Sequence, residues 1–233
     1  MPRKPRMYLP HIPVHLVQRG NNRNACFFAE DDYHFYLDCL GRGLRRYGVQ
    51  LHAYVLMTNH VHLLLTPQDE TGISRLMQYL GRQYVGYINK TYRRSVTLWE
   101  GRHKASLVQA DNYLLTCMRY IELNPVTAGM VERPEQYPWT SYHHNAWGKT
   151  DNLISQQLVY QALGASSTER QLAYRALFRN QLPDTDIHEL QACLTYNYPL
   201  GNSRFRDEIE AMQGRPIGKR QRGRPSSPST GED

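Results

Sequence analysis

Residues 57–65 of the chain read MTNHVHLLL, with two histidines on either side of one valine and an apolar run directly after them. Side chains alternate across a β-strand, so His60 and His62 share one face of such a strand. The other face carries three apolar side chains, those of Val61, Leu63 and Leu65. We therefore expect this segment to be a strand whose apolar face meets the core and whose imidazoles converge on the opposite side.

The segments around this strand alternate between strand-like and helix-like patterns. Thr58-Asn59 separates two β-prone runs at a spacing that favours a tight hairpin. Asp111 can cap a helix that Pro125 and Gly129 end. The expected strands cover residues 12–19, 51–57, 60–66 and 106–109, and the other expected helices cover residues 30–47 and 72–92. The order βαββαβ plus one helix predicts an α+β, ferredoxin-like antiparallel sheet with an added helix.

The chain divides into three expected parts. Residues 1–147 carry the strand and helix pattern, and residues 148–213 read as a small helical extension with helices near 154–163, 169–180, 186–194 and 204–212. Residues 214–233 contain Gly, Pro, Ser and Arg but almost no apolar side chains, so we expect a basic disordered tail. The first part and the tail hold the positive charge, whereas the extension is net negative.

Composition limits the classes of function. A formal net charge of +7 over 233 residues suggests an anionic partner such as nucleic acid. No apolar run approaches the roughly 20 residues that span a bilayer, and no apolar region follows the basic start, so we expect no membrane association and a cytoplasmic, nucleoid-associated protein. The four cysteines are far apart, which indicates neither a disulfide framework nor a zinc ribbon.

Two groups of residues can carry chemistry. Two neutral imidazoles at His60 and His62 make a divalent-metal site that needs further ligands, although such a pair can also be two half-exposed polar residues. Tyr120 and Asn124 lie four residues apart, so on a helix they share a face and present a phenol and an amide together. The chain holds 17 tyrosines, and packing is the ordinary role for most of them.

Taken together, these motifs resemble a known family. The histidine pair on a strand, followed by Tyr-x-x-x-Asn on a helix, is similar to the single-tyrosine HUH nucleases and transposases. The segments QRGNNR, VLMTNHVHLLL, LWEGRHK and RYIELNPVTAGMV resemble, in this order, the REP-associated tyrosine transposases. The resemblance covers residues 8–147, and a weaker similarity continues into GNSRFRDEIEAMQGRP.

The resemblance implies a role for each matching residue. His60 and His62 would bind Mg²⁺ or Mn²⁺, and Asn124 would be a third metal ligand. Tyr120 would be the nucleophile that takes up the 5′ end of a cut single strand as a phosphotyrosine. The substrate implied is single-stranded DNA that forms palindromic hairpins. No small-molecule cofactor is implied, and relatives include both monomers and homodimers.

Other residues are candidates by chemical type. His103, Lys104 and Glu122 are candidates by proximity for the base that accepts the phenolic proton, and the sequence singles out none of them. Arginine, lysine and asparagine side chains contact phosphates and base edges. The candidate DNA-binding residues are Arg3, Lys4, Arg6, Arg19, Asn21, Asn22, Arg23, Arg102, Lys104, Arg220, Arg222 and Arg224.

Three functions stay open. The first is a metal-dependent strand transferase that nicks and rejoins single-stranded palindromic elements through Tyr120. The second is a hairpin-DNA-binding protein without catalysis. The third is a metal phosphodiesterase that uses activated water, with Tyr120 in a structural role.

Overall fold

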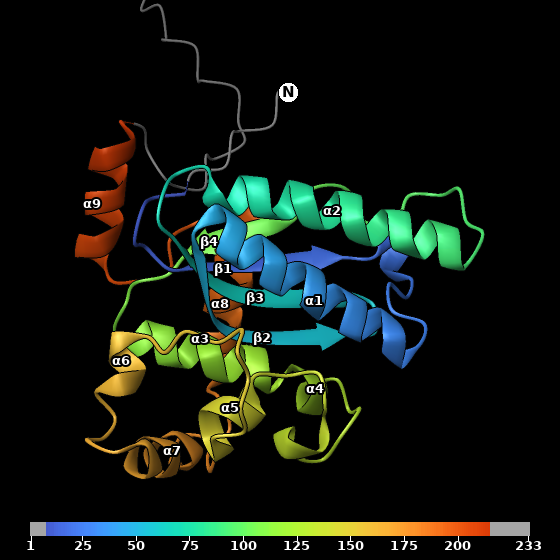
Figure 1. The fold of residues 1–233 in the computed structure, drawn as a ribbon. Helices are drawn as coiled ribbons and strands as arrows, with labels where there is room; N and C mark the ends of the chain where they lie inside the picture. The colour runs from blue at the N-terminus through green and yellow to red at the C-terminus, as the bar shows by residue number, and fades with distance from the viewer. Residues whose placement is uncertain (1–7, 215–233) are drawn as a thin grey trace, which may run out of the picture.

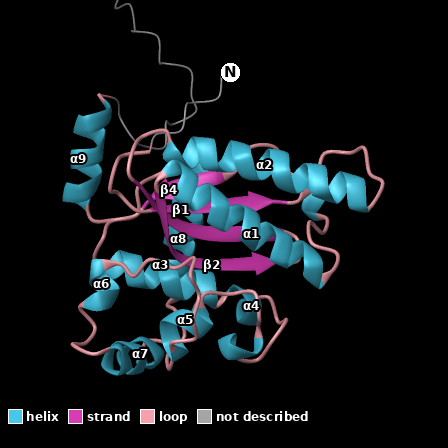
Figure 2. Ribbon diagram, in the orientation of Figure 1, coloured by secondary structure: helices cyan, strands magenta, loops and turns pink. Residues whose placement is uncertain are grey.

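The computed structural model describes residues 8–214 of the chain. It contains one four-stranded antiparallel sheet in the spatial order β2-β3-β1-β4. The strands are β1 (Val14–Arg19), β2 (Val49–Met57), β3 (His60–Pro67) and β4 (Lys104–Leu107). Helix α1 (Glu30–Tyr47) joins β1 to β2, and helix α2 (Gly72–Thr91) joins β3 to β4. Order and pairing confirm the predicted ferredoxin-like arrangement (Figures 1 and 2).

Strand β3 is the centre of this arrangement because it is buried on both faces. Val61, Leu63 and Leu65 are fully buried in a core that α1 and α2 cover. Figure 1 shows these two helices side by side over one face of the sheet. They approach closely at Gly43, where an added Cβ would lie 2.5 Å from a methyl carbon of Leu76. The alternation predicted for this strand is therefore confirmed.

A second core lies on the face of the sheet that carries the histidines. Leu64 of β3 and Val55 of β2 belong to it, and the first helix to pack there is α3 (Asn112–Glu122). The other helices are α4 (Asn124–Thr127), α5 (Tyr142–Trp147), α6 (Leu158–Gln161), α7 (Ser167–Ala176), α8 (Asp184–Tyr196) and α9 (Ser203–Gln213), and residues 21–23 and 134–136 form single 3₁₀ turns. Tyr160, Tyr174 and Leu190 from the extension are buried in this same core. The extension thus shares a core with the sheet, while its boundary at residue 147 stays a prediction.

The extension also pairs with the sheet edges, and there the predicted helix at 154–163 is wrong. Ile154 bridges Leu51 of the edge strand β2, and the Ser155 amide donates to the Leu51 carbonyl at 2.7 Å. Open backbone groups on an edge strand favour such pairing, so only α6 remains helical in this segment.

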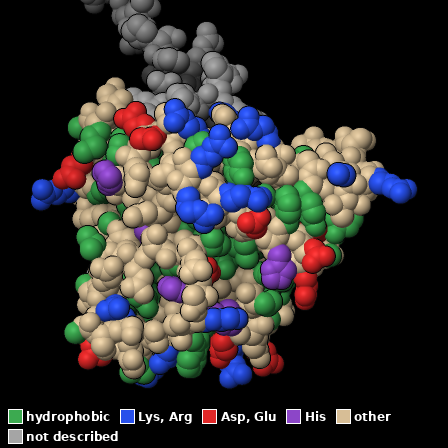
Figure 3. Space-filling view, viewed as in Figure 1, with side chains coloured by type: hydrophobic (Ala, Val, Ile, Leu, Met, Phe, Trp, Pro, Cys, Tyr) green, Lys and Arg blue, Asp and Glu red, His purple; other side chains and the backbone are tan. Residues whose placement is uncertain are grey.

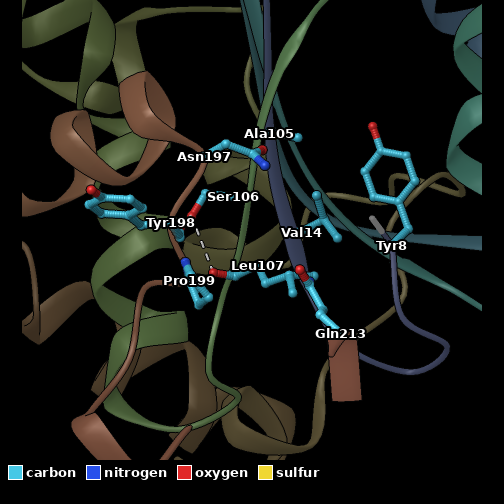
Figure 4. A pocket seen from close by; sticks show the side chains of 9 residues that line it. All are labelled: Tyr8, Val14, Ala105, Ser106, Leu107, Asn197, Tyr198, Pro199 and Gln213. Atoms are coloured by element: carbon cyan, nitrogen blue, oxygen red, sulfur yellow. Dashed lines mark hydrogen bonds between the residues drawn. The ribbon is translucent and has the colours of Figure 1, made fainter. Parts of the chain in front are cut away.

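At the other edge, the strand predicted at 106–109 begins two residues earlier, because Lys104 already pairs with Val17 of β1. Just after β4, Val108 pairs with Leu200. The Ser106 hydroxyl donates to the Tyr198 carbonyl at 2.5 Å, and Figure 4 shows these two residues side by side. The extension therefore covers both edges of the sheet.

All four cysteines are free and buried. Within residues 8–214 no helix combines the length and the apolar character that crossing a bilayer requires.

The two-sided burial of β3 predicts a large effect of one side-chain truncation. Leu63→Ala should lower the free energy of unfolding by about 2–5 kcal/mol, because it removes buried contacts and leaves a cavity. Urea denaturation followed by circular dichroism measures this change. The matched control is Leu158→Ala, since Leu158 is 76% exposed, and it should change stability by less than about 0.5 kcal/mol. Equal effects of the two substitutions would contradict the role assigned to β3.

Candidate active site

The two histidines lie next to β1 in the sheet. The register places Arg19 opposite His60 and Val17 opposite His62. Alternation along β1 brings Arg19, Val17 and His15 to the face that carries both histidines. The ring centroids of His60 and His62 are 5.0 Å apart, so the predicted convergence of the two imidazoles is observed.

A break in the helix fixes the side chain of Asn124. Pro125 has no amide hydrogen and cannot bond the carbonyl one turn back, so α3 ends at Glu122 and α4 begins at Asn124. The Asn124 side-chain amide donates to the Tyr120 carbonyl at 2.7 Å and, at 3.4 Å, to the carbonyl of Ile121, which Pro125 cannot bond. The Asn124 side chain also lies in hydrogen-bond contact with the His60 ring.

Tyr120 lies against the histidines, where the family resemblance implies a nucleophile. The Tyr120 ring meets the ring of His62 edge-on with centroids 5.8 Å apart, and the ring of His15 in the same way at 5.9 Å. The four residues His60, His62, Tyr120 and Asn124 therefore come together in one chain, from one strand and one broken helix. This grouping is what a tyrosine nucleophile beside a metal site requires.

These residues line a cleft of about 860 Å³ between the sheet and the extension. Val17, Arg19 and Lys104 line it from the sheet side. The opposite wall consists of residues 178–182 and helix α8, which contributes Gln191. The Gln191 side chain hydrogen-bonds the phenol of Tyr120. The extension thus supplies one wall of the cleft and one direct contact to the candidate nucleophile.

Burial keeps the imidazoles neutral. It lowers the pKa of His60 to about 4, with a further decrease from the nearby Arg19 guanidinium. Burial lowers the pKa of His15 to about 3 and holds the pKa of His62 well below its usual value. Neutral rings have a lone pair for a cation at neutral pH.

The phenol of Tyr120 is subject to opposing influences. Burial raises its pKa, whereas the hydrogen bond from Gln191 and the positive charge of Arg19 lower it. Both lowering groups favour the phenolate, which is the nucleophilic form.

The ligand set suits a divalent cation in an open site. Within residues 8–214 no three His, Cys, Asp or Glu side chains lie together as metal ligands. The candidate ligands are two neutral imidazoles and one amide oxygen, and remaining positions would fall to water or phosphate oxygens. An ion with few protein ligands keeps positions for a substrate, so these residues fit a divalent cation whose coordination sphere stays open to phosphate oxygens.

The candidate DNA contacts fall into three groups. Arg19 and Lys104 line the cleft. Asn21, Asn22 and Arg23 form the 3₁₀ turn after β1, which lies beside the histidines because the Asn59 side chain donates to the Arg23 carbonyl at 3.0 Å. Arg102 is exposed outside the cleft lining. Arg3, Lys4, Arg6, Arg220, Arg222 and Arg224 lie outside the described residues.

Positive charge alone does not mark the cleft. Figure 3 shows Lys and Arg side chains gathered over α1 and the first half of α2. The exposed arginines of these helices are Arg42, Arg45, Arg46, Arg75 and Arg82. They lie across the sheet from the histidines, because α1 and α2 cover the other face.

The structure excludes one of the three candidate bases. Glu122 is fully buried behind α3 and accepts hydrogen bonds from Ser141 at 2.6 Å, Asn145 at 2.9 Å and Tyr174 at 2.7 Å. It faces away from Tyr120 because two residues along a helix turn a side chain to the far side. His103 is buried against the Tyr8 hydroxyl, and only Lys104 lines the cleft.

Sequence reasoning missed His15 and Gln191. His15 precedes Arg19 by four residues on one strand, so alternation already places both on the histidine face. Gln191 gives no such signal, because only the packing of the extension brings it to Tyr120.

The fold and the site define a class. An antiparallel ferredoxin-like sheet that presents two histidines to one tyrosine on a following helix is the arrangement expected for the single-tyrosine HUH transposases. Residues 9–124 match the family described as "Transposase IS200 like", and through this segment the chain belongs to that family. The chain is a DNA transposase.

One curated protein and one solved structure are similar to this chain. A Haemophilus influenzae protein described as a REP-associated tyrosine transposase is 27% identical over 125 residues, which cover 46% of this chain and 71% of the relative. A solved structure of a REP-associated tyrosine transposase bound to a REP hairpin matches with a TM-score of 0.54 and 17% identity, covering 68% of this chain and 93% of that chain. This second likeness agrees with the fold.

The buried Glu122 predicts a pH dependence of stability. Burial raises the pKa of this carboxyl to about 7 from 4.5, so the folded protein keeps a proton that the unfolded chain loses above pH 4.5. Glu122 therefore contributes most to the free energy of unfolding below pH 4.5, and this contribution is lost as the pH rises through 7.

Relative to Glu122→Gln, the wild-type protein should lose about 3 kcal/mol of unfolding free energy between pH 4.5 and 7. The buried histidines also make stability depend on pH, in the opposite direction, because their pKa values are lowered. Both proteins contain them, so their effect cancels in the difference. Denaturant titrations of both proteins at several pH values measure it. A constant difference across this range would show that Glu122 ionises normally in the fold.

Proposed function

We propose that the protein cleaves and rejoins single-stranded DNA beside a hairpin through a covalent 5′-phosphotyrosine on Tyr120, with Mg²⁺ or Mn²⁺ bound by His60, His62 and Asn124. The observation that carries this proposal is the edge-on contact of the Tyr120 ring with His62 inside a cleft that also holds Asn124. A purely structural tyrosine would not need to line a cleft of this size beside neutral imidazoles.

The reaction balances without an external energy source. The phenolic oxygen of Tyr120 attacks phosphorus, the bond from phosphorus to the 3′ oxygen breaks, and that oxygen takes a proton to become a free 3′-OH. The phosphate stays on the 5′ end of the downstream strand, now esterified to tyrosine. Attack by a 3′-OH on the same phosphorus reverses the step and releases Tyr120.

The residues of the cleft divide the work. A divalent ion at the two histidines and Asn124 would supply neutralisation of charge on the phosphate oxygens. Arg19 stabilises the phenolate and offers a cation to the substrate, and Lys104 lies on the same wall, where its ammonium group can contact phosphate. Gln191 holds the phenolic oxygen in place from the opposite wall.

The substrate class follows from the cleft and from one relative. The matched REP-associated transposase is a protein bound to a REP hairpin, which favours a hairpin substrate for this chain as well. The 3₁₀ turn at Asn21–Arg23 lies next to His60, and we expect unpaired bases to pass this turn as they enter the cleft. All catalytic candidates come from one chain, so a monomer would suffice. Such a protein would act in the cytoplasm, at the nucleoid.

The first test is covalent capture of the nucleophile. Labelled single-stranded hairpin DNA, with unpaired bases on both sides of the stem, is incubated with protein and Mn²⁺ and resolved on a denaturing gel. We expect a protein–DNA adduct with wild type and none with Tyr120→Phe, because phenylalanine keeps the ring contacts but has no attacking oxygen. Tyr113→Phe is the control and should form the adduct, since Tyr113 lies outside the cleft lining.

Other results distinguish the alternatives. Cleavage without an adduct by both wild type and Tyr120→Phe would identify water as the nucleophile. Binding without cleavage by wild type, across hairpins of varied flanking sequence, would favour a hairpin-binding protein. Either result would overturn the proposed function.

The contact from Gln191 predicts a change in the pH profile. Gln191→Leu should shift cleavage to higher pH and lower its rate at pH 7 by about tenfold, because a hydrogen bond to a charged group contributes about 1.5 kcal/mol or more. Single-turnover rates from pH 6 to 10 measure the shift. Gln156→Leu, at an exposed position outside the cleft lining, should keep the wild-type profile. A lower rate without a shift would argue against stabilisation of the phenolate.

A further inference from the structure

His15 is a buried side chain in hydrogen-bond contact with His62, and the proposed reaction does not use it. It is 1% exposed on β1, and its Nε2 lies 2.9 Å from Nδ1 of His62. The two rings are stacked with centroids 5.1 Å apart. The edge of Tyr120 also meets the His15 ring, so this residue touches both the candidate ligand and the candidate nucleophile.

The contact constrains the tautomer of His62. A neutral imidazole has one N–H and one lone pair, and a nitrogen that binds a cation must present the lone pair. Nδ1 of His62 is already engaged with His15, which leaves Nε2 as the nitrogen for a cation. The proton must then lie on Nδ1, and His15 Nε2 must accept it.

We propose that His15 is a positioning residue that accepts the Nδ1 proton of His62 and thereby holds His62 in the tautomer whose Nε2 binds the divalent ion. The inference rests on the proposed function, since it assumes a cation at the two histidines. Partners of this kind fix the orientation of histidine ligands in metal sites and raise their basicity.

The second histidine shows the same arrangement independently. Nδ1 of His60 lies 2.6 Å from the side-chain oxygen of Asn59. The Asn59 amide group donates to the Arg23 carbonyl at 3.0 Å, which turns its oxygen toward His60. An amide oxygen can only accept, so His60 carries its proton on Nδ1 as well. In both candidate ligands, therefore, Nδ1 donates its proton to an acceptor, and Nε2 keeps its lone pair for a cation in the cleft.

Packing alone does not account for an imidazole at position 15. With Nε2 engaged, Nδ1 of His15 is buried and has no hydrogen-bond partner among residues 8–214. Leaving a buried polar nitrogen unpaired destabilises the fold. A phenyl ring would stack on His62 and meet Tyr120 without this penalty. What the imidazole adds is the acceptor at Nε2.

The test measures metal affinity and tautomer rather than catalysis. Mn²⁺ binding to metal-free protein is determined by isothermal titration calorimetry for wild type, His15→Phe and His15→Gln. We expect His15→Phe to bind about 10- to 100-fold more weakly, because the phenyl ring keeps the packing and removes the acceptor. His15→Gln should stay within about threefold of wild type, since the glutamine oxygen restores an acceptor.

A buried histidine elsewhere provides the control. His52 is 2% exposed on β2 and bonds Thr66 and the Ser155 carbonyl, and none of these three residues lines the cleft. His52→Phe should leave Mn²⁺ affinity unchanged even where it lowers the melting temperature. This variant separates a loss of stability from a loss of metal binding.

Nuclear magnetic resonance reads the tautomer directly. Two-bond ¹H–¹⁵N correlations of the Mg²⁺-saturated protein should show the His62 proton on Nδ1 in wild type and in His15→Gln. In His15→Phe this assignment should be lost.

The outcomes separate the inference from the proposed function. Wild-type affinity in His15→Phe, or an equal loss in His15→Phe and His15→Gln, overturns the role of His15 and leaves the metal site in place. If wild type does not bind Mn²⁺, or if His62→Ala binds it as wild type does, the proposed metal site fails and the inference fails with it.

Discussion

The structure depends on the alternation of side chains along β3, because the two faces of this one strand contact different environments. Its odd-numbered residues after His60 fill the core under α1 and α2, and its even-numbered residues carry the histidines and then Leu64 into the second core. A shift of one residue in the pairing with β1 would exchange the two sets. The register that buries Leu63 is therefore the register that presents His62.

The active-site geometry then follows from one proline. Pro125 ends α3 and leaves a carbonyl that the Asn124 side chain satisfies, so the amide is held by the backbone rather than by a ligand. Since Tyr120 lies four residues earlier, in the last turn of α3, the phenol and the Asn124 amide reach the histidines as a unit. Preorganisation of this kind lets a cleft with few protein ligands keep its geometry before substrate arrives.

Much of the fold and the inner site was predictable from local pattern. Alternation gave the faces of β3, and helical spacing placed Tyr120 with Asn124. The pattern failed where tertiary contacts override local preference, as at Ile154, which pairs with an edge strand instead of forming a helix. Glu122 illustrates a second limit. It is close to Tyr120 in sequence, but a separation of two residues on a helix places its side chain on the opposite side, where it bonds Ser141.

The outer half of the site was hidden for a physical reason. Gln191 lies 71 positions after Tyr120 along the chain, and it reaches the phenol only because the extension is anchored at Leu200 and Ile154 on both edges of the sheet. Edge pairing is therefore more than a cover for exposed backbone groups. It fixes α8 across from β3 and converts an open sheet face into a two-walled cleft. A ferredoxin-like sheet alone would present the histidines and Tyr120 to solvent, whereas the extension encloses them where charge interactions with a phosphodiester are stronger.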